Sequence, residues 1–164
     1  MRKLVLSIHL TVSVGWIGAA AAYLALDVAT VATSDPQILR AAYIGMNLIV
    51  RAVIVPLAIT TLASGVVVSL TTRWGLFRHY WVVISLALTV VATVVLLFET
   101  QTVSALAAAA ANPEQLTELD STLVHSIGGV LILTAVLVLN VYKPRGVTRY
   151  GRRRQQSSRV DGSA

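Results

Sequence analysis

The sequence predicts an all-α fold, a four-helix transmembrane bundle with up-down-up-down topology. The 164 residues are 56% hydrophobic and only 12% charged, with a mean hydropathy of +0.78, whereas soluble domains average roughly 25% charged residues. Apolar segments long enough to cross a bilayer recur at about 4–26, 50–71, 80–99 and 121–142. We therefore expect an integral membrane protein, with a four-helix membrane domain over 1–143 and a basic, disordered tail over 144–164.

The first apolar segment, 4–26, contains no Lys, Arg, Asp or Glu. Its polar and amphipathic side chains recur at steps of three or four, which keeps them on one helix face: His9, Ser13, Trp16, Ala20, Tyr23 and Asp27. The basic start of the chain is also typical of a secretory signal peptide. The apolar run, however, is longer than the ~7–15 residues of a signal core, which favours a membrane helix with one stripe turned toward neighbouring helices.

A loop over 27–35 is expected before the second helix. Ser34-Asp35-Pro36 predicts a helix start, because a capping side chain precedes a proline whose missing N–H has no helical partner in the first turn. The helical pattern then runs over 37–70, with Asn47 and Arg51 on its inward stripe. Pro56 is expected to kink this helix or to loosen one turn.

The connection over 71–79 combines aromatic residues with arginines, as is typical of a loop at the membrane interface. The third helix is expected from Tyr80 to at least Phe98, with the alanine-rich segment 100–111 as its continuation. The last helix is expected to begin at Pro113 and to cross the membrane over 121–142. Its predicted inward stripe contains Ser121, His125 and a glycine at 128 or 129. Small residues around Gly129 are expected to let the helix backbones approach closely.

The basic residues predict the orientation. With the N-terminus inside, 11 of the 13 Lys and Arg residues lie on the inner side, and only Arg40 and Arg51 lie outside. The positive-inside rule then places both termini in the cytoplasm, with the chain as a multi-pass protein of a bacterial inner (plasma) membrane. Seven basic residues follow Tyr142. We interpret this tail as a topology signal that attracts anionic lipid headgroups rather than nucleic acid.

Four ionisable residues from four helices are predicted to form a polar cluster: Asp27, Arg51, Glu99 and His125. Counting ~1.5 Å per residue from the inner end of each helix places them roughly 25–34 Å up, near the outer lipid boundary. Because charges near lipid face the bundle and pair, we expect Arg51 to pair with Glu99 or Asp27, with His125 close by. The alternative is that these side chains mark helix ends at the headgroups.

His9, His79 and His125 are the candidate cofactor ligands. His9 lies within the hydrocarbon layer, and His79 lies on the same side of the membrane, so the two could hold a b-type haem or a copper ion. The alternative is that His9 bonds to Ser13 or to Asn140 of another helix, and that His79 is interfacial. His125 is separated from His9 by more than ~15 Å in depth, so these two should not share one iron.

Two short motifs carry a resemblance to known families. His9-x6-Trp16-x-Gly18 resembles the first helix of copper-resistance D domains and of HemJ-type protoporphyrinogen oxidases. The run from Trp74 to Val82 is similar to the start of the third helix in small bacterial four-helix integral membrane proteins, a domain of unknown function, and this similarity spans roughly 1–143. The HemJ-type resemblance implies haem binding at His9. The chain lacks the fuller set of charges of that enzyme, and only Met46 and the three dispersed histidines offer copper ligands.

Two functional hypotheses follow. The first is a haem- or metal-binding membrane protein with His9 as the principal ligand; the second is a non-catalytic membrane subunit or small transporter-like module that contacts a copy of itself or another membrane protein. The sequence contains no Gly-rich phosphate loop, HExxH or GxSxG motif, and no cysteine. No catalytic residue is therefore predicted, and enzyme activity stays open.

Overall fold

In the computed structural model, which describes residues 2–72, 75–112 and 121–153, the chain is all-helical apart from short connections. The helices are α1 (Arg2–Ala32), α2 (Pro36–Ile49), the π-helix η1 (Val50–Ile54), α3 (Val55–Thr71), α4 (Tyr80–Ala109) and α5 (Leu123–Tyr142). Within these described residues, four continuous helical stretches are long and apolar enough to span a membrane: Lys3–Ala32, Pro36–Thr71, Tyr80–Ala109 and Leu123–Tyr142. The predicted all-α class with four candidate spans is thereby confirmed.

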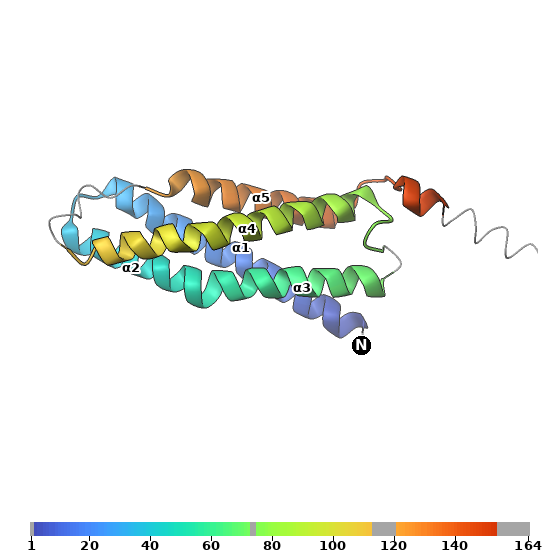
Figure 1. The fold of residues 1–164 in the computed structure, drawn as a ribbon, viewed down its shortest axis with the longest axis horizontal. Coiled ribbons are helices and arrows are strands. Elements are labelled where there is room, and N and C mark those ends of the chain that lie inside the picture. Colours follow the sequence, from blue (N-terminus) through green and yellow to red (C-terminus); the bar gives the residue numbers. More distant parts are fainter. Residues whose placement is uncertain (1, 73–74, 113–120, 154–164) are drawn as a thin grey trace, which may run out of the picture.

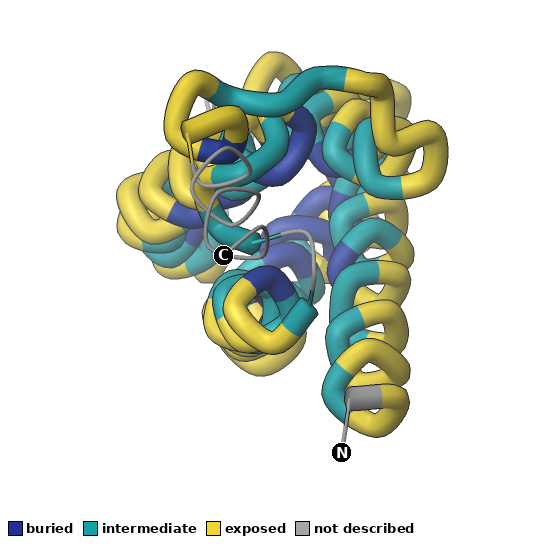
Figure 2. Tube along the Cα trace, turned by 90° about the vertical axis from the view of Figure 1, so that its right-hand side faces the viewer, coloured by how far each residue is buried: buried dark blue, intermediate teal, exposed yellow. Residues whose placement is uncertain are grey.

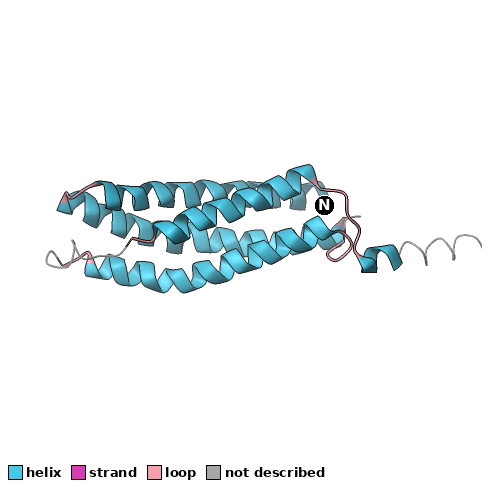
Figure 3. Ribbon diagram, turned by 90° about the horizontal axis from the view of Figure 1, so that it is seen from above, coloured by secondary structure: helices cyan, strands magenta, loops and turns pink. Residues whose placement is uncertain are grey.

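The long helices run side by side along the molecule (Figure 1). The start of α1, the α3–α4 connection and the end of α5 lie at one end, while the α1–α2 connection and the end of α4 lie at the other. Both α1 and α4 pack against α2, α3 and α5. The view from above shows the same lengthwise arrangement, with the loops gathered at the two ends (Figure 3).

The interior is built from large side chains near the middle of the bundle. Trp16, Tyr43, Met46, Ile54 and Leu133 are buried and belong to one apolar cluster. Leucines, valines and isoleucines elsewhere are exposed on the outer faces, as Figure 2 shows by the yellow outer sides of the tube. An apolar exterior is favourable only when the surrounding medium is itself apolar, which is consistent with four helices that face lipid.

Helix α1 is longer than the sequence indicated. The predicted loop began at Asp27, but the helix continues to Ala32, because Asp27 turns into the bundle instead of ending the helix. The predicted stripe is confirmed: Trp16, Tyr23 and Asp27 are buried, and the other stripe residues are partly buried. The α2 start is also confirmed, since Asp35 accepts a hydrogen bond from the Gln37 backbone N–H at 2.8 Å.

The loosened turn expected at Pro56 is the π-helix η1, Val50–Ile54, which immediately precedes it. Proline has no N–H, and its ring clashes with the carbonyl of the residue four positions earlier, so a widened turn relieves the conflict. This turn changes the helix face. Val50 and Ile54 are buried, whereas Arg51, which was predicted to lie on the inward stripe, is exposed.

Many Ser and Thr hydroxyls bond within their own helix. Ser13, Thr89, Thr93 and Thr134 each donate to the carbonyl four residues earlier, at 2.6–2.8 Å. Other hydroxyls bond between helices, as Ser104 does to Asn47 and Ser126 does to Asp27. In an apolar medium every polar group needs a partner, and the preceding carbonyl is the nearest acceptor.

Helix α4 ends at Ala109, so the alanine-rich continuation is confirmed. The predicted start of the last helix at Pro113 lies outside the described residues. Helix α5 ends where Lys143 adopts a left-handed conformation (φ 46°), and Pro144 follows.

The first part of the tail has ordered contacts, in contrast to the predicted disorder from residue 144. His79 and Val147 form an antiparallel bridge. The Thr148 backbone N–H donates to the Arg78 carbonyl at 3.0 Å, and the Thr148 hydroxyl donates to the Phe77 carbonyl at 2.5 Å. The backbone beyond α5 thus pairs with the loop before α4, which a composition-based expectation of disorder does not anticipate. Residues 154–164 lie outside the described part of the chain.

Candidate functional site: a cavity between α4 and α5

A cavity of about 270 Å³ lies between α4 and α5. We call it the α4–α5 cavity; its lining includes Trp16, Tyr23, Ile54, Glu99, His125 and Gly129. The floor comes from α1 and η1, and the sides come from α4 and α5. Val95, Val124 and His125 line the cavity and are exposed, so it opens at the molecular surface.

Glycine and alanine in the lining explain why space remains here. Gly128 and Gly129 of α5 face the cavity, and a Cβ added at either position would meet nothing within 4 Å. Ala20 and Ala92 supply further short side chains from α1 and α4. The sequence prediction that small residues near Gly129 bring helices into close contact is therefore not what the structure has, because these glycines leave a gap.

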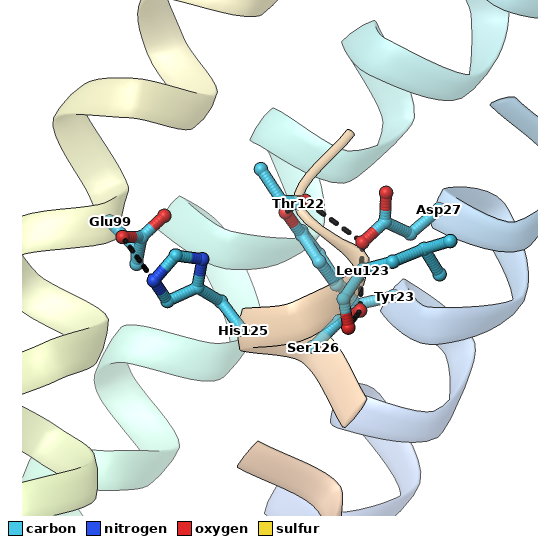
Figure 4. Close-up of polar contacts among 7 residues, drawn as sticks. All are labelled: Tyr23, Asp27, Glu99, Thr122, Leu123, His125 and Ser126. Carbon is cyan, nitrogen blue, oxygen red and sulfur yellow. Dashed lines mark hydrogen bonds and ion pairs between the residues drawn. The ribbon is translucent and has the colours of Figure 1, made fainter. Parts of the chain in front are cut away.

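Two carboxylates flank this space. Glu99 of α4 pairs with His125 of α5, with 3.4 Å between Glu99 Oε1 and His125 Nε2 (Figure 4). The Glu99 side chain is 23% exposed and the His125 side chain is 55% exposed. This pair lies at the rim of the α4–α5 cavity. It joins two residues of the predicted polar cluster.

Asp27 lies behind the cavity wall and is completely buried. Its Oδ2 accepts hydrogen bonds from the Ser126 hydroxyl at 2.7 Å and from the Thr122 hydroxyl at 2.9 Å (Figure 4). Ser121 makes a longer contact of 3.5 Å to Oδ1. Among the described residues, hydroxyls are the side-chain donors to Asp27, and no basic side chain pairs with its carboxyl group.

Hydroxyl groups connect Asp27 to the cavity. Ser126 both lines the α4–α5 cavity and donates to Asp27. Tyr23 lines it too, and its hydroxyl is 2.8 Å from the Thr122 hydroxyl, which in turn bonds to Asp27. A molecule that bonds to Ser126 in the cavity is therefore connected to the carboxyl group of Asp27 through one hydroxyl.

Arg51 does not join this cluster, and the predicted pairing with Glu99 or Asp27 is wrong. The guanidinium donates to the Ser104 hydroxyl at 2.7 and 3.1 Å and to the Asn47 side-chain oxygen at 3.2 Å. The π-helix is the physical reason, since it turns Arg51 away from the face that carries Ile54. Of the predicted cluster, the structure therefore brings Glu99 and His125 together, places Asp27 one layer behind, and separates Arg51.

His9 lies in the contact between α1 and α3. Its Nδ1 is 3.0 Å from the Ser64 hydroxyl, and its ring packs on Gly65. It therefore bonds to a neighbouring helix, as one sequence alternative held, but the partner is Ser64 instead of Ser13 or Asn140. Asn140 donates to the Val136 carbonyl of its own helix. His9 is not part of the α4–α5 cavity lining.

His79 immediately precedes α4 and bridges to Val147 through the backbone. Among the residues that the structure describes, no three of His, Asp and Glu come together in a way that could hold a metal ion. His125 is the candidate ligand that faces a cavity. The roles of His9, His79 and His125 as cofactor ligands stay predictions.

Sequence reasoning missed Thr122 and Ser126. It placed Ser121 and His125 on the inward stripe of α5, but Thr122 and Leu133 are the buried residues, and Ser126 and Gly129 are partly buried. The inward face is thus offset by one position. A signal was present, because 122, 126, 129 and 133 have the same helical spacing as the chosen stripe.

Comparison of the whole chain with protein-family models, with curated proteins and with solved structures gives no match. The interpretation of the site therefore depends on its own geometry and chemistry.

Proposed function

We propose that this chain is a four-span integral membrane protein that takes a small, membrane-soluble molecule into the α4–α5 cavity. The observation that carries the proposal is the cavity itself. It is apolar over most of its lining, and it opens beside exposed apolar residues of α4 and α5. Ligand sites are concave and mostly apolar, with a few convergent polar groups that set orientation; Glu99, His125 and Ser126 are such groups here. This is a binding function of the transporter-like or subunit class, without a catalytic step.

The orientation in the membrane is part of the proposal. We infer an up-down-up-down bundle with both termini in the cytoplasm of a bacterial cell and the chain in the inner membrane. Eleven of 13 basic residues on one side support this under the positive-inside rule. The start of α1 and the end of α5 lie at the same end of the bundle in Figure 1, which supports placing both termini on one side of the membrane. The tail residues then meet anionic headgroups, and lipid-facing surfaces are available to a second copy or another membrane protein.

Photolabelling tests the cavity directly. The probe is phenyl(trifluoromethyl)diazirine, an apolar ring compound that enters the bilayer and labels neighbouring residues on illumination. We expect saturable labelling of α4 and α5 residues around the cavity when the protein is held in phosphatidylcholine nanodiscs. Gly129→Phe should fill the cavity and abolish the saturable component.

Gly18→Phe is the matched control, because Gly18 is also a helical glycine with nothing within 4 Å of an added Cβ, but it does not line the cavity. Labelling in this variant should remain saturable. Uniform, non-saturable labelling of all lipid-facing residues, unchanged by Gly129→Phe, would refute the proposal.

Haem binding is a second candidate function, favoured by one observation: His125 faces a cavity beside two glycines that leave room for a flat ring. The fit to His9, which the HemJ-type resemblance implied, is poor, because its imidazole packs on Gly65 within a helix contact. A bound haem would give the purified protein a Soret band. The band should vanish in His125→Ala and persist in His9→Ala. If copper is bound instead, metal analysis of the purified protein should detect it. The copper should be lost in His125→Ala and retained in His9→Ala.

A further inference from the structure

The chemical character of the α4–α5 cavity indicates which molecules it accepts. Its charged groups are a carboxylate at the rim, Glu99, and a second carboxylate one hydrogen bond behind the wall, Asp27. Among the described residues that line the cavity, His125 is the only basic group, and it is charged only when protonated. Even a fully protonated His125 balances one of the two carboxylates.

Arginines do not correct this imbalance. Arg51, on the helix that supplies part of the floor, donates to Ser104 and Asn47 and does not line the cavity. Arg40, nearer the same end of the molecule, donates to the Ala110 and Ala111 carbonyls at 3.0 Å. Both guanidiniums are thus engaged outside the cavity.

Two aromatic rings also line the cavity. Trp16 and Tyr23 line the floor, and both are almost fully buried. The faces of such rings attract cations, most strongly for Trp and when water is excluded. Carboxylates in a medium of low dielectric constant also gain from a cation that replaces their lost hydration. Aromatic faces, more carboxyl groups than basic groups, and apolar walls together recognise one class of molecule.

We propose that the α4–α5 cavity selects lipophilic organic cations, such as ring-bearing quaternary ammonium compounds, over neutral or anionic molecules of the same shape. This inference rests on the proposed ligand-binding function and names the ligand class for the same site. The apolar body of the ligand packs against Ile54 and Leu133. Its cationic centre lies near the ring of Trp16 and the carboxylate of Glu99. An anion would face two carboxylates and gain nothing from the rings.

The test compares ring-bearing ligands of similar size that differ in charge. Radiolabelled benzyltrimethylammonium is equilibrated with the full chain in phosphatidylcholine nanodiscs, with empty nanodiscs as the blank. Neopentylbenzene, its neutral carbon isostere, and phenylacetate, an anion of similar size, serve as competitors. We expect saturable binding of the cation, with at least tenfold weaker competition by either competitor than by unlabelled cation.

Variants connect the selectivity to the named groups. Glu99→Gln keeps the shape of the side chain and removes its charge, and should weaken cation binding about tenfold while photolabelling by the neutral diazirine probe persists. Asp35→Asn is the control, because it removes the charge of a carboxylate that does not line the cavity. Asn also caps a helix as well as Asp does, so the start of α2 should persist. This variant should leave binding unchanged.

Each outcome separates the two proposals. Equal competition by the neutral isostere in the unmodified protein overturns the cation selectivity while the ligand-binding function stands. Stronger competition by phenylacetate also overturns it. If the cation does not bind and diazirine labelling is not saturable, both proposals fail. The comparison of ligands needs no variant, so a misfolded Glu99→Gln protein would not remove the test.

Discussion

At the residue scale, Asp27 is a completely buried acidic side chain that is held by hydroxyl groups. In an apolar medium its charge depends on donated hydrogen bonds, and the Ser126 hydroxyl makes the shortest of them, at 2.7 Å. This hydrogen bond joins α1 to α5. Hydrogen bonds to charged groups contribute more than neutral ones, although measured values between membrane helices are often below the expectation.

Ser126→Ala should lower the free energy of unfolding by about 1–2 kcal/mol, because it leaves one Asp27 oxygen with a single strong donor. Titration of the purified protein from mild detergent into sodium dodecyl sulfate, followed by circular dichroism, measures this. Thr134→Val is the control on the same helix, since the Thr134 hydroxyl bonds only to the Val130 carbonyl. It should change stability by less than about 0.5 kcal/mol. Equal losses in the two variants would contradict a special role for Ser126.

Gly65 decides how closely α1 and α3 approach. A Cβ at this position would lie 3.1 Å from His9 Cε1, which is tighter than ordinary packing. Gly65→Ala should therefore push the His9 ring away from Ser64 and lower the free energy of unfolding by about 1–2 kcal/mol. Gly18→Ala, where an added Cβ meets nothing, should be neutral or stabilising by up to about 1 kcal/mol, because alanine favours a helix. The same detergent titration compares them, and a Gly65→Ala protein as stable as Gly18→Ala would argue against tight packing at His9.

At the scale of elements, the segment after α5 behaves as part of the fold. Gly151 lies against the loop before α4, where an added Cβ would be 2.6 Å from the Arg78 carbonyl oxygen and 2.7 Å from Val147 Cγ1. Backbone is hard to displace, so this position accepts only glycine while the contact persists. The Gly151 N–H also donates to the Thr148 hydroxyl at 3.1 Å.

Arg149 is exposed in the structure, but its backbone belongs to a segment that is bonded to the loop before α4. Gly151→Ala should release this segment and make the peptide bond after Arg149 accessible to protease. We expect trypsin to cleave after Arg149 several-fold faster in the detergent-solubilised variant, with the products identified by mass spectrometry, because cleavage follows local opening. Gly146→Ala is the matched control, since its Cβ would be at an ordinary 3.4 Å from the Tyr80 ring. Its cleavage rate should stay near that of the unmodified chain; unchanged cleavage in both variants would show that the contact does not restrain the segment.

Elements also show where sequence reasoning succeeds. Spans and the α2 start follow from local rules, namely apolar length and the Asp35-Pro36 cap, and both are confirmed. The Arg51 error has a cause that local rules do not contain. Pro56 predicts a disturbed turn, but packing decides whether the helix kinks or widens there. The widened turn η1 determines that the Arg51 side chain lies on the exposed face of the helix.

Local helical spacing predicted one part of the site, the Glu99–His125 pair, but not the contact of Ser126 with Asp27. Helical spacing placed Glu99 and His125 at similar depth, and they form a pair. Spacing alone gave two equally periodic stripes on α5, one through His125 and one through Ser126. Only the tertiary position of the buried Asp27 selects the second. The cavity itself could not be predicted, because glycines at 128 and 129 are equally compatible with a close helix contact and with an open space.

At the scale of the whole molecule, the distribution of charge predicts how the bundle lies in the membrane. The chain contains no cysteine, so single cysteines report accessibility without a background. Ser34, in the exposed α1–α2 connection, should face outward, and Ser157, in the basic tail sequence, should face the cytoplasm. Intact cells that produce Ser34→Cys should react with a membrane-impermeant maleimide, whereas Ser157→Cys should react only after the membrane is permeabilised.

The unmodified chain is the control for this labelling and should not react under either condition. Reversed accessibility of the two cysteines would invert the bundle and move the α4–α5 cavity toward the cytoplasmic leaflet. Labelling of both cysteines in intact cells would require an even number of membrane crossings between residues 34 and 157, instead of the three that we predict. Asp27 lies five residues before the end of α1 at Ala32, Glu99 lies in the second half of α4 (Tyr80–Ala109), and His125 lies near the start of α5 at Leu123. These three residues are therefore nearer the α1–α2 connection than the tail, and the expected result opens the cavity to the outer leaflet. Cationic ligands would then enter from the outer half of the bilayer, where the basic tail exerts no repulsion.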